Sequence, residues 1–168
     1  MFILICGTSG SGKSFYAEER LKDFETSKKF YIAAAKIYDD EMKERVKRHQ
    51  AMRKDKGFIT IEKAFNLNEI EIEKNSSVLI EALTTWLANE MFENKNKNPA
   101  EKILSDFHTL KAKCENIILV SDDIFSDGVI YDDLTENYIK TLAELTKKFA
   151  NEADEVIECF AGLPVRLK

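Results

Sequence analysis

The feature that most constrains this chain is the segment Gly7-Thr8-Ser9-Gly10-Ser11-Gly12-Lys13-Ser14, which fits the pattern G-x-x-x-x-G-K-[ST]. The apolar run Phe2–Cys6 precedes it directly, and a helical pattern follows it. A phosphate-binding loop needs this context, because its glycines let successive backbone N–H groups converge on phosphate oxygens while the helix adds its positive N-terminal dipole. We expect Lys13 to reach the β- and γ-phosphates of a nucleotide and the Ser14 hydroxyl to ligate Mg²⁺. The pattern predicts nucleotide binding but does not specify the reaction.

Beyond the loop, short apolar runs alternate with amphipathic stretches, which favours an α/β fold with a mostly parallel sheet. Several runs lack polar alternation, as expected for strands that are buried on both faces. The predicted strands are Phe2–Cys6, Phe30–Ala34, Phe58–Ile61, Val78–Glu81, Ile117–Ser121 and Glu155–Ala161, the last at or near the sheet edge. The predicted helices are Lys13–Phe24, Asp39–Met52, Leu67–Lys74, Thr84–Phe92, Pro99–Cys114 and Asp132–Asn151. We expect one domain over residues 1–168.

The composition excludes several classes of protein. Charged residues make up 33% of the chain and hydrophobic residues 44%, which is typical of a globular protein and not of a disordered one. No apolar run approaches the roughly 20 residues of a membrane span. The net charge of −5 argues against a general nucleic-acid-binding role. The three cysteines are odd in number and far apart, which indicates reduced, buried thiols in a cytoplasmic protein.

Two predicted strands end in carboxylates that suit a Mg²⁺ site, since the cation beside a phosphate loop is also held by an acidic residue after another buried strand. Glu81 ends the run Val78–Glu81, and Asp122 and Asp123 follow the run Ile117–Ser121. Any strand can end in a surface carboxylate. Between these candidates we favour Glu81.

A second candidate site lies in the strongly basic segment 39–56, DDEMKERVKRHQAMRKDK. At 100° per residue His49 falls on the inward-leaning face of a helix, with Arg45 and Arg53 on its edges. A neutral imidazole in such a setting can attack an α-phosphorus, because the cations stabilise the charge that develops. The residues alone favour a solvated basic helix with one half-buried histidine. The other histidine, His108, is predicted to be structural or at the surface.

Five blocks of the sequence, taken in order, make the chain resemble the bifunctional adenosylcobinamide kinase / adenosylcobinamide-phosphate guanylyltransferase family of cobalamin (vitamin B12) biosynthesis. The blocks are ILICGTSGSGKSFYAEE, FYIAAAKIYDDEMKERVKRHQAMR, ITIE, VLIEALTTWLANEMF and ADEVIECFAGLPVRLK. They span nearly the whole chain. The phosphate loop is common to many unrelated proteins, whereas DDEM…RH together with the AGLP…K ending is much more specific.

The resemblance implies two reactions at one nucleotide site. First, ATP or GTP phosphorylates the hydroxyl of the aminopropanol arm of adenosylcobinamide. GMP from GTP then passes through a covalent guanylyl-histidine to adenosylcobinamide phosphate, giving adenosylcobinamide-GDP. By position His49 matches the guanylylated histidine, and we expect Lys13 to be the other catalytic residue. The expected nucleotide contacts are Gly7, Thr8, Ser9, Gly10, Ser11, Gly12, Lys13, Ser14, Ala33, Ala34, Ala35, Gln50, Ala51, Met52, Arg53, Glu62 and Glu81, with Ser14 and Glu81 as the Mg²⁺ ligands.

The implied fold is a three-layer P-loop NTPase fold of the RecA-like type, with a mostly parallel sheet flanked by helices. A corrinoid is the implied substrate, with neither a nucleic-acid partner nor a membrane span. The implied assembly is a homo-oligomer, with a trimer as one option.

The segment Asp122–Tyr131 departs from the family pattern, and we expect this loop to contribute to the corrinoid side of the site or to a subunit interface. Two other hypotheses stay open. One is a P-loop kinase for a small metabolite without guanylyltransferase activity, and the other is a non-catalytic nucleotide-sensing module. Both leave the DDEM…RH block unexplained.

Overall fold

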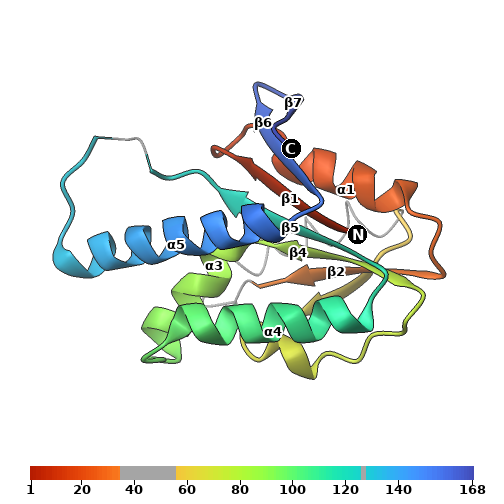
Figure 1. Cartoon of the computed structure of the whole chain (residues 1–168), viewed down its shortest axis with the longest axis horizontal. Coiled ribbons are helices and arrows are strands. Elements are labelled where there is room, and N and C mark those ends of the chain that lie inside the picture. The colour runs from red at the N-terminus through yellow and green to blue at the C-terminus, as the bar shows by residue number, and fades with distance from the viewer. Residues whose placement is uncertain (35–55, 126–127) are drawn as a thin grey trace, which may run out of the picture.

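The structure, a computed structural model, describes residues 1–34, 56–125 and 128–168. Its frame is a seven-stranded sheet with the order β3-β2-β4-β5-β1-β6-β7 (Figure 1). The strands are β1 (Phe2–Gly7), β2 (Lys28–Ala33), β3 (Ile59–Glu62), β4 (Ser76–Glu81), β5 (Asn116–Asp122), β6 (Glu155–Phe160) and β7 (Leu163–Arg166). All neighbouring strands are parallel except β6 and β7. The predicted mostly parallel sheet is therefore confirmed.

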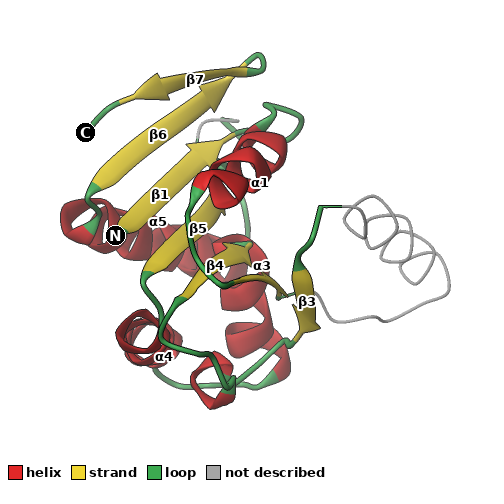
Figure 2. Ribbon diagram, turned by 90° about the vertical axis from the view of Figure 1, so that its right-hand side faces the viewer, coloured by secondary structure: helices red, strands yellow, loops and turns green. Residues whose placement is uncertain are grey.

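Helices cover both faces of this sheet. The helical elements are α1 (Lys13–Asp23), η1 (Leu67–Glu69), α3 (Leu83–Ala88), the π-helical turn η2 (Asn89–Glu93), α4 (Pro99–Lys113) and α5 (Asp133–Glu152). Strand β1 shows why two layers form, since its successive side chains point to opposite faces. Phe2 and Leu4 pack with α3, α4 and α5, whereas Ile3 and Ile5 pack with α1. Figure 2 shows α4 and α5 on the side of the sheet away from α1.

Three aromatic rings occupy the larger of these two cores. The Phe107 ring lies 4.7 Å, between centroids, from those of both Phe2 and Phe149, which joins β1 to α4 and α5. All three side chains are fully buried. In the part of the chain that the structure describes, no helix is both long enough and apolar enough to cross a membrane.

The predicted helix starts agree with the structure where capping chemistry marks them. Pro99 occupies the first turn of α4, where its missing N–H costs nothing. Asp132 caps α5, because its carboxylate accepts hydrogen bonds from the backbone N–H groups of Leu134 and Thr135, both at 2.9 Å.

Two predictions of secondary structure were wrong or incomplete. The predicted helix Leu67–Lys74 is only the single turn η1, which ends at Ile70 in an extended conformation, and no helix follows before β4. Strand β7 was not predicted, because its residues are exposed and lack a buried apolar pattern. The predicted helix Asp39–Met52 lies outside the described residues.

Candidate functional site

The candidate site lies along the edge of the sheet where the parallel strands end. The register places Gly7 of β1 beside Asp122 of β5, and Ala33 of β2 between Glu62 of β3 and Glu81 of β4. In open α/β sheets this edge is where ligands bind, because the loops after parallel strands leave a crevice there. The fold thus brings the described candidate residues into one row.

The phosphate loop is shaped by close approaches that leave no room for side chains. A Cβ atom at Gly7 would lie 2.5 Å from the Ser11 Oγ and 2.7 Å from the backbone oxygen of Cys159. Gly12 has a φ of +89°, and a Cβ there would lie 3.1 Å from the Cα of Gly162, in the turn between β6 and β7. The Gly162 N–H also donates a 3.0 Å hydrogen bond to the Ser11 backbone oxygen. The C-terminal hairpin therefore supports the loop directly.

Donors in and after the loop are available to an anion. Helix α1 has Gly12 at its N-cap and no side-chain cap, so no capping side chain takes up the N–H groups of its first turn. The Ser11 Oγ is buried and has no hydrogen-bond partner among the described residues. Unpaired donors at a helix N-terminus fit the phosphate groups of a nucleotide.

Lys13 is held at the bottom of this loop. It is 7% exposed, its Nζ donates to the Thr8 backbone oxygen at 3.1 Å, and it forms a 2.7 Å ion pair with the Asp122 Oδ1. The other oxygen of Asp122 accepts a 2.6 Å hydrogen bond from the Thr84 hydroxyl. Lys13 is therefore positioned by a carboxylate that the sequence analysis weighed only as a Mg²⁺ ligand.

Ser14 and Glu81, the two expected Mg²⁺ ligands, are in contact. The Ser14 hydroxyl donates to the Glu81 Oε1, and the Tyr31 hydroxyl donates to the Glu81 Oε2. A hydroxyl and a carboxylate are the oxygen donors that Mg²⁺ takes from proteins beside bound phosphates. The donor set fits the cation, and the assignment of Ser14 and Glu81 as its ligands stays a prediction.

The remaining described candidates line the same edge further from the loop. Ala34 donates its N–H to the Glu81 backbone oxygen at 2.9 Å, and the Ala33 backbone oxygen accepts from Lys63 at 3.1 Å. Glu62 ends β3, next to Ala33. The candidates Ala35, His49, Gln50, Ala51, Met52 and Arg53 lie outside the described residues.

Three residues near the site were not chosen from the sequence. Thr84 and Tyr31 reach it by hydrogen bonds to Asp122 and Glu81, and Asp122 reaches it through Lys13. Of these three residues, Asp122 could have been found from the sequence, because it follows an apolar strand. Tyr31 lies within a strand, and no local pattern marks it.

Cys6 precedes the loop, and its surroundings make it a poor nucleophile. Burial, followed by the neighbouring carboxylates of Asp123 and Glu158, raises the pKa of its thiol to about 12. A thiol that stays protonated at neutral pH does not react as a thiolate. All three cysteines are free, as predicted, although only Cys159 is fully buried.

His108 is exposed and pairs with Glu152 at 2.8 Å, which agrees with its predicted surface role.

Comparison with solved structures places the fold. The chain is similar to the crystal structure of the flagellar accessory protein FlaH from Methanocaldococcus jannaschii, with a TM-score of 0.51, 12% identity, and coverage of 99% of this chain and 77% of that chain. It is also similar to a structure from Pyrococcus horikoshii, with a TM-score of 0.52, 9% identity, and coverage of 99% and 85%. The fold is the predicted P-loop NTPase fold of the RecA-like type.

Comparison with characterised sequences places the family. The chain is 29% identical to the bifunctional adenosylcobalamin biosynthesis protein CobU of Escherichia coli over the full length of both chains. It is 31% identical to the bifunctional adenosylcobalamin biosynthesis protein CobP of Pseudomonas aeruginosa, over 98% of this chain and 96% of that protein. Residues 3–167 match the family described as cobinamide kinase / cobinamide phosphate guanyltransferase. Because the family match covers nearly every residue and the phosphate loop forms where the sequence predicts it, the chain belongs to the cobinamide kinase / cobinamide phosphate guanyltransferase family.

Proposed function

We propose that this chain phosphorylates adenosylcobinamide with ATP or GTP, and then transfers GMP from GTP to adenosylcobinamide phosphate through a covalent guanylyl-histidine at His49. Both reactions are assigned to a single domain that spans residues 1–168. The observation that carries the proposal is the arrangement of Lys13, Ser14 and Glu81 around a phosphate loop, in a chain that matches this family over residues 3–167.

In the kinase step the γ-phosphoryl group moves from the nucleotide to the acceptor hydroxyl. The backbone N–H groups of the loop and the start of α1 bind the phosphate oxygens, and the Lys13 ammonium stabilises the charge that develops on them. Ser14 and Glu81 would hold Mg²⁺. When bound, this cation would neutralise part of the triphosphate charge. The described residues thus account for positioning and charge stabilisation, the two contributions that dominate phosphoryl transfer.

In the guanylyl step the His49 imidazole attacks the α-phosphorus of GTP, a phosphorus–nitrogen bond forms, and pyrophosphate leaves. The GMP group then passes to the phosphate of adenosylcobinamide phosphate, and the imidazole is released. The assignment of His49 rests on its position in the RH motif and on the surrounding arginines of the sequence.

The proposal extends to the setting of the enzyme. We assign it a homo-oligomeric state, a cytoplasmic location and no nucleic-acid partner, with support from the family resemblance, the three free cysteines and the net charge of −5. Light scattering coupled to size-exclusion chromatography tests the first of these, and a monomeric mass would contradict it.

Intact-protein mass spectrometry after incubation with GTP and Mg²⁺ tests the covalent chemistry. We expect a mass gain of one GMP that is lost in acid, absent from His49→Ala, and retained in the matched control His108→Ala, whose imidazole is exposed and paired with Glu152. Lys13→Ala is expected to lose both reactions, whereas His49→Ala keeps the kinase step. No adduct in the wild type despite GTP binding would refute the guanylyl-histidine and leave a kinase or a nucleotide sensor.

A further inference from the structure

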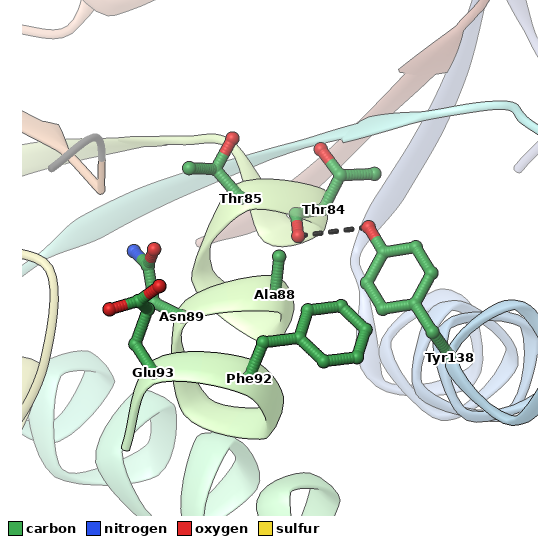
Figure 3. Close-up of a pocket in the computed structure, with 7 residues that line it drawn as sticks. All are labelled: Thr84, Thr85, Ala88, Asn89, Phe92, Glu93 and Tyr138. Carbon is green, nitrogen blue, oxygen red and sulfur yellow. Dashed lines mark hydrogen bonds between the residues drawn. The ribbon is translucent and has the colours of Figure 1, made fainter. Parts of the chain in front are cut away.

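A cavity of about 320 Å³ lies beside the phosphate site, between the helix formed by α3 and η2 and the start of α5. Two rows of side chains on that helix line it, one through Thr84 and Ala88 and one through Thr85 and Asn89. Tyr138 of α5 faces them, and its ring lies 5.7 Å from that of Phe92 between centroids. Figure 3 shows these residues around the cavity, with the Tyr138 hydroxyl directed at the backbone of Thr84.

One wall of this cavity is connected to the catalytic lysine by direct contacts. Thr84, which is 8% exposed, donates its hydroxyl to Asp122 at 2.6 Å, and the other oxygen of Asp122 pairs with Lys13 at 2.7 Å. The Tyr138 hydroxyl donates to the Thr84 backbone oxygen at 3.0 Å. Thr84 is therefore two contacts, a hydrogen bond and an ion pair, from the lysine that we expect at the γ-phosphate.

The helix that forms the floor of the cavity departs from α-helical geometry there. Residues Asn89–Glu93 form a π-helical turn, a rare conformation that occurs mostly at functional sites. Within it Asn89, Phe92 and Glu93 line the cavity, whereas the buried Glu90 does not and accepts a hydrogen bond from Asn94. The π turn thus lies at the residues that line the cavity.

We propose that this cavity receives the hydroxyl-bearing arm of the acceptor, and that Thr84, whose own hydroxyl is held by Asp122, orients the acceptor hydroxyl toward the phosphate loop. The inference rests on the proposed function. The volume lies at the lower end of the range for small-molecule pockets, so the cavity accommodates an arm while a macrocycle stays outside it.

The chemistry of the lining suits an uncharged alcohol arm. Ala88 and the rings of Phe92 and Tyr138 offer apolar surface, and Thr84 and Thr85 offer hydroxyl groups. The Tyr138 hydroxyl is a neutral donor at physiological pH, and burial, with the nearby Asp122 carboxylate, raises its pKa further, to about 12. An incoming hydroxyl can donate to the oxygen of the Thr84 hydroxyl, which lines the cavity, while the Thr84 O–H remains bonded to Asp122.

Filling the cavity tests this assignment. Ala88→Leu adds three carbons at a half-buried helical position that lines the cavity, and Thr85→Leu replaces a hydroxyl with a larger apolar side chain in the neighbouring row. The matched control is Ala112→Leu, which makes the same change at an exposed position of α4. The full-length proteins are compared in a kinase assay with ATP and adenosylcobinamide, with nucleotide affinity measured separately by calorimetry and folding by circular dichroism.

We expect the KM for adenosylcobinamide to rise by about tenfold or more in each cavity variant. The nucleotide Kd should stay within about twofold of the wild-type value, and Ala112→Leu should behave as wild type. If the wild type is active and the KM is unchanged in folded Ala88→Leu and Thr85→Leu, the assignment of this cavity to the acceptor arm is overturned. The proposed function is then left intact. A wild-type protein that binds ATP but never phosphorylates adenosylcobinamide overturns the proposed function, and this inference with it.

Discussion

The ion pair between Lys13 and Asp122 leads to an unusual prediction, that removing a charge next to the nucleotide site tightens nucleotide binding. In the structure the Lys13 Nζ lies 2.7 Å from the Asp122 Oδ1. When Lys13 contacts a phosphate, it loses part of its ion pair with Asp122. The negative charge of the Asp122 carboxylate also repels the incoming polyanion. Asp122→Asn removes the negative charge and retains an oxygen that can accept the hydrogen bond from Thr84.

The size of the effect follows from the burial of the pair. Two unit charges 2.7 Å apart attract by about 6 kcal/mol at an effective dielectric constant of 20, and desolvation offsets most of this. The two side chains are 9% and 30% exposed, between a surface pair and a buried one. We assign the ion pair a net stabilisation of about 1–2 kcal/mol. Its loss in Asp122→Asn corresponds to a Kd for the nucleotide that is lower by roughly 5- to 30-fold. The free protein loses the same pair, so its Tm should fall by about 2–8 °C.

Isothermal titration calorimetry with a non-hydrolysable GTP analogue measures the affinity, and thermal unfolding of the free protein measures the stability. The matched control is Asp123→Asn, which removes the neighbouring carboxylate, whose Oδ1 accepts from the Phe125 N–H and which has no ion pair with Lys13. Opposite changes in affinity and Tm, seen in Asp122→Asn alone, support the reasoning. Binding that is unchanged or weaker in Asp122→Asn refutes it.

Three further predictions concern stability. Gly7→Ala should destabilise the protein by about 1–3 kcal/mol, because the added Cβ would lie 2.5 Å from the Ser11 Oγ; an unchanged Tm in thermal unfolding would contradict this. Phe107→Ala should cost about 3–5 kcal/mol in urea unfolding, since it removes a fully buried ring that contacts two others, and a loss below 1 kcal/mol would be inconsistent with that packing. Hydrogen bonds from backbone N–H groups, that of Thr135 first, lower the pKa of Asp132 below its ordinary value of 3.8. The stability advantage of wild type over Asp132→Asn should therefore be complete above that value and disappear as the pH falls through the lower folded pKa, and urea midpoints in which the gap widens toward low pH would exclude it.

The parts of the fold that the sequence predicted are those where local patterns and tertiary structure agree. Strand β1 is apolar on both faces and continues into a glycine loop, so its identity and its parallel neighbours followed from the residues alone. Pro99 and Asp132 marked helix starts through their own backbone chemistry. The site residues Ser14 and Glu81 could be paired because a phosphate loop requires a carboxylate from another buried strand.

The contacts that the sequence could not predict depend on distant segments. Gly162 approaches Gly12 only because the β6–β7 hairpin folds over the loop, and no periodic pattern in either segment records that approach. Thr84 lies in a predicted helix, and no local pattern in that helix indicates its hydrogen bond to Asp122. The turn η1 shows the opposite error, because helical propensity around Leu67 was overridden by the extended conformation that begins at Ile70.

The position of β1 between β5 and β6 also determines how this protein acquires its activity as it folds. Phe2, at the start of β1, donates its backbone N–H at 2.6 Å to the carboxylate of Asp154, which directly precedes β6 and lies 152 positions away in the chain. Closing such long loops carries a large entropic cost before the contacts form, which slows folding and makes it cooperative. A fragment that ends before β5 would contain every residue of the phosphate loop, yet it would lack the strands on both sides of β1. The capacity to bind nucleotide should therefore arise late in folding and all at once, so that nucleotide affinity reports the completed sheet.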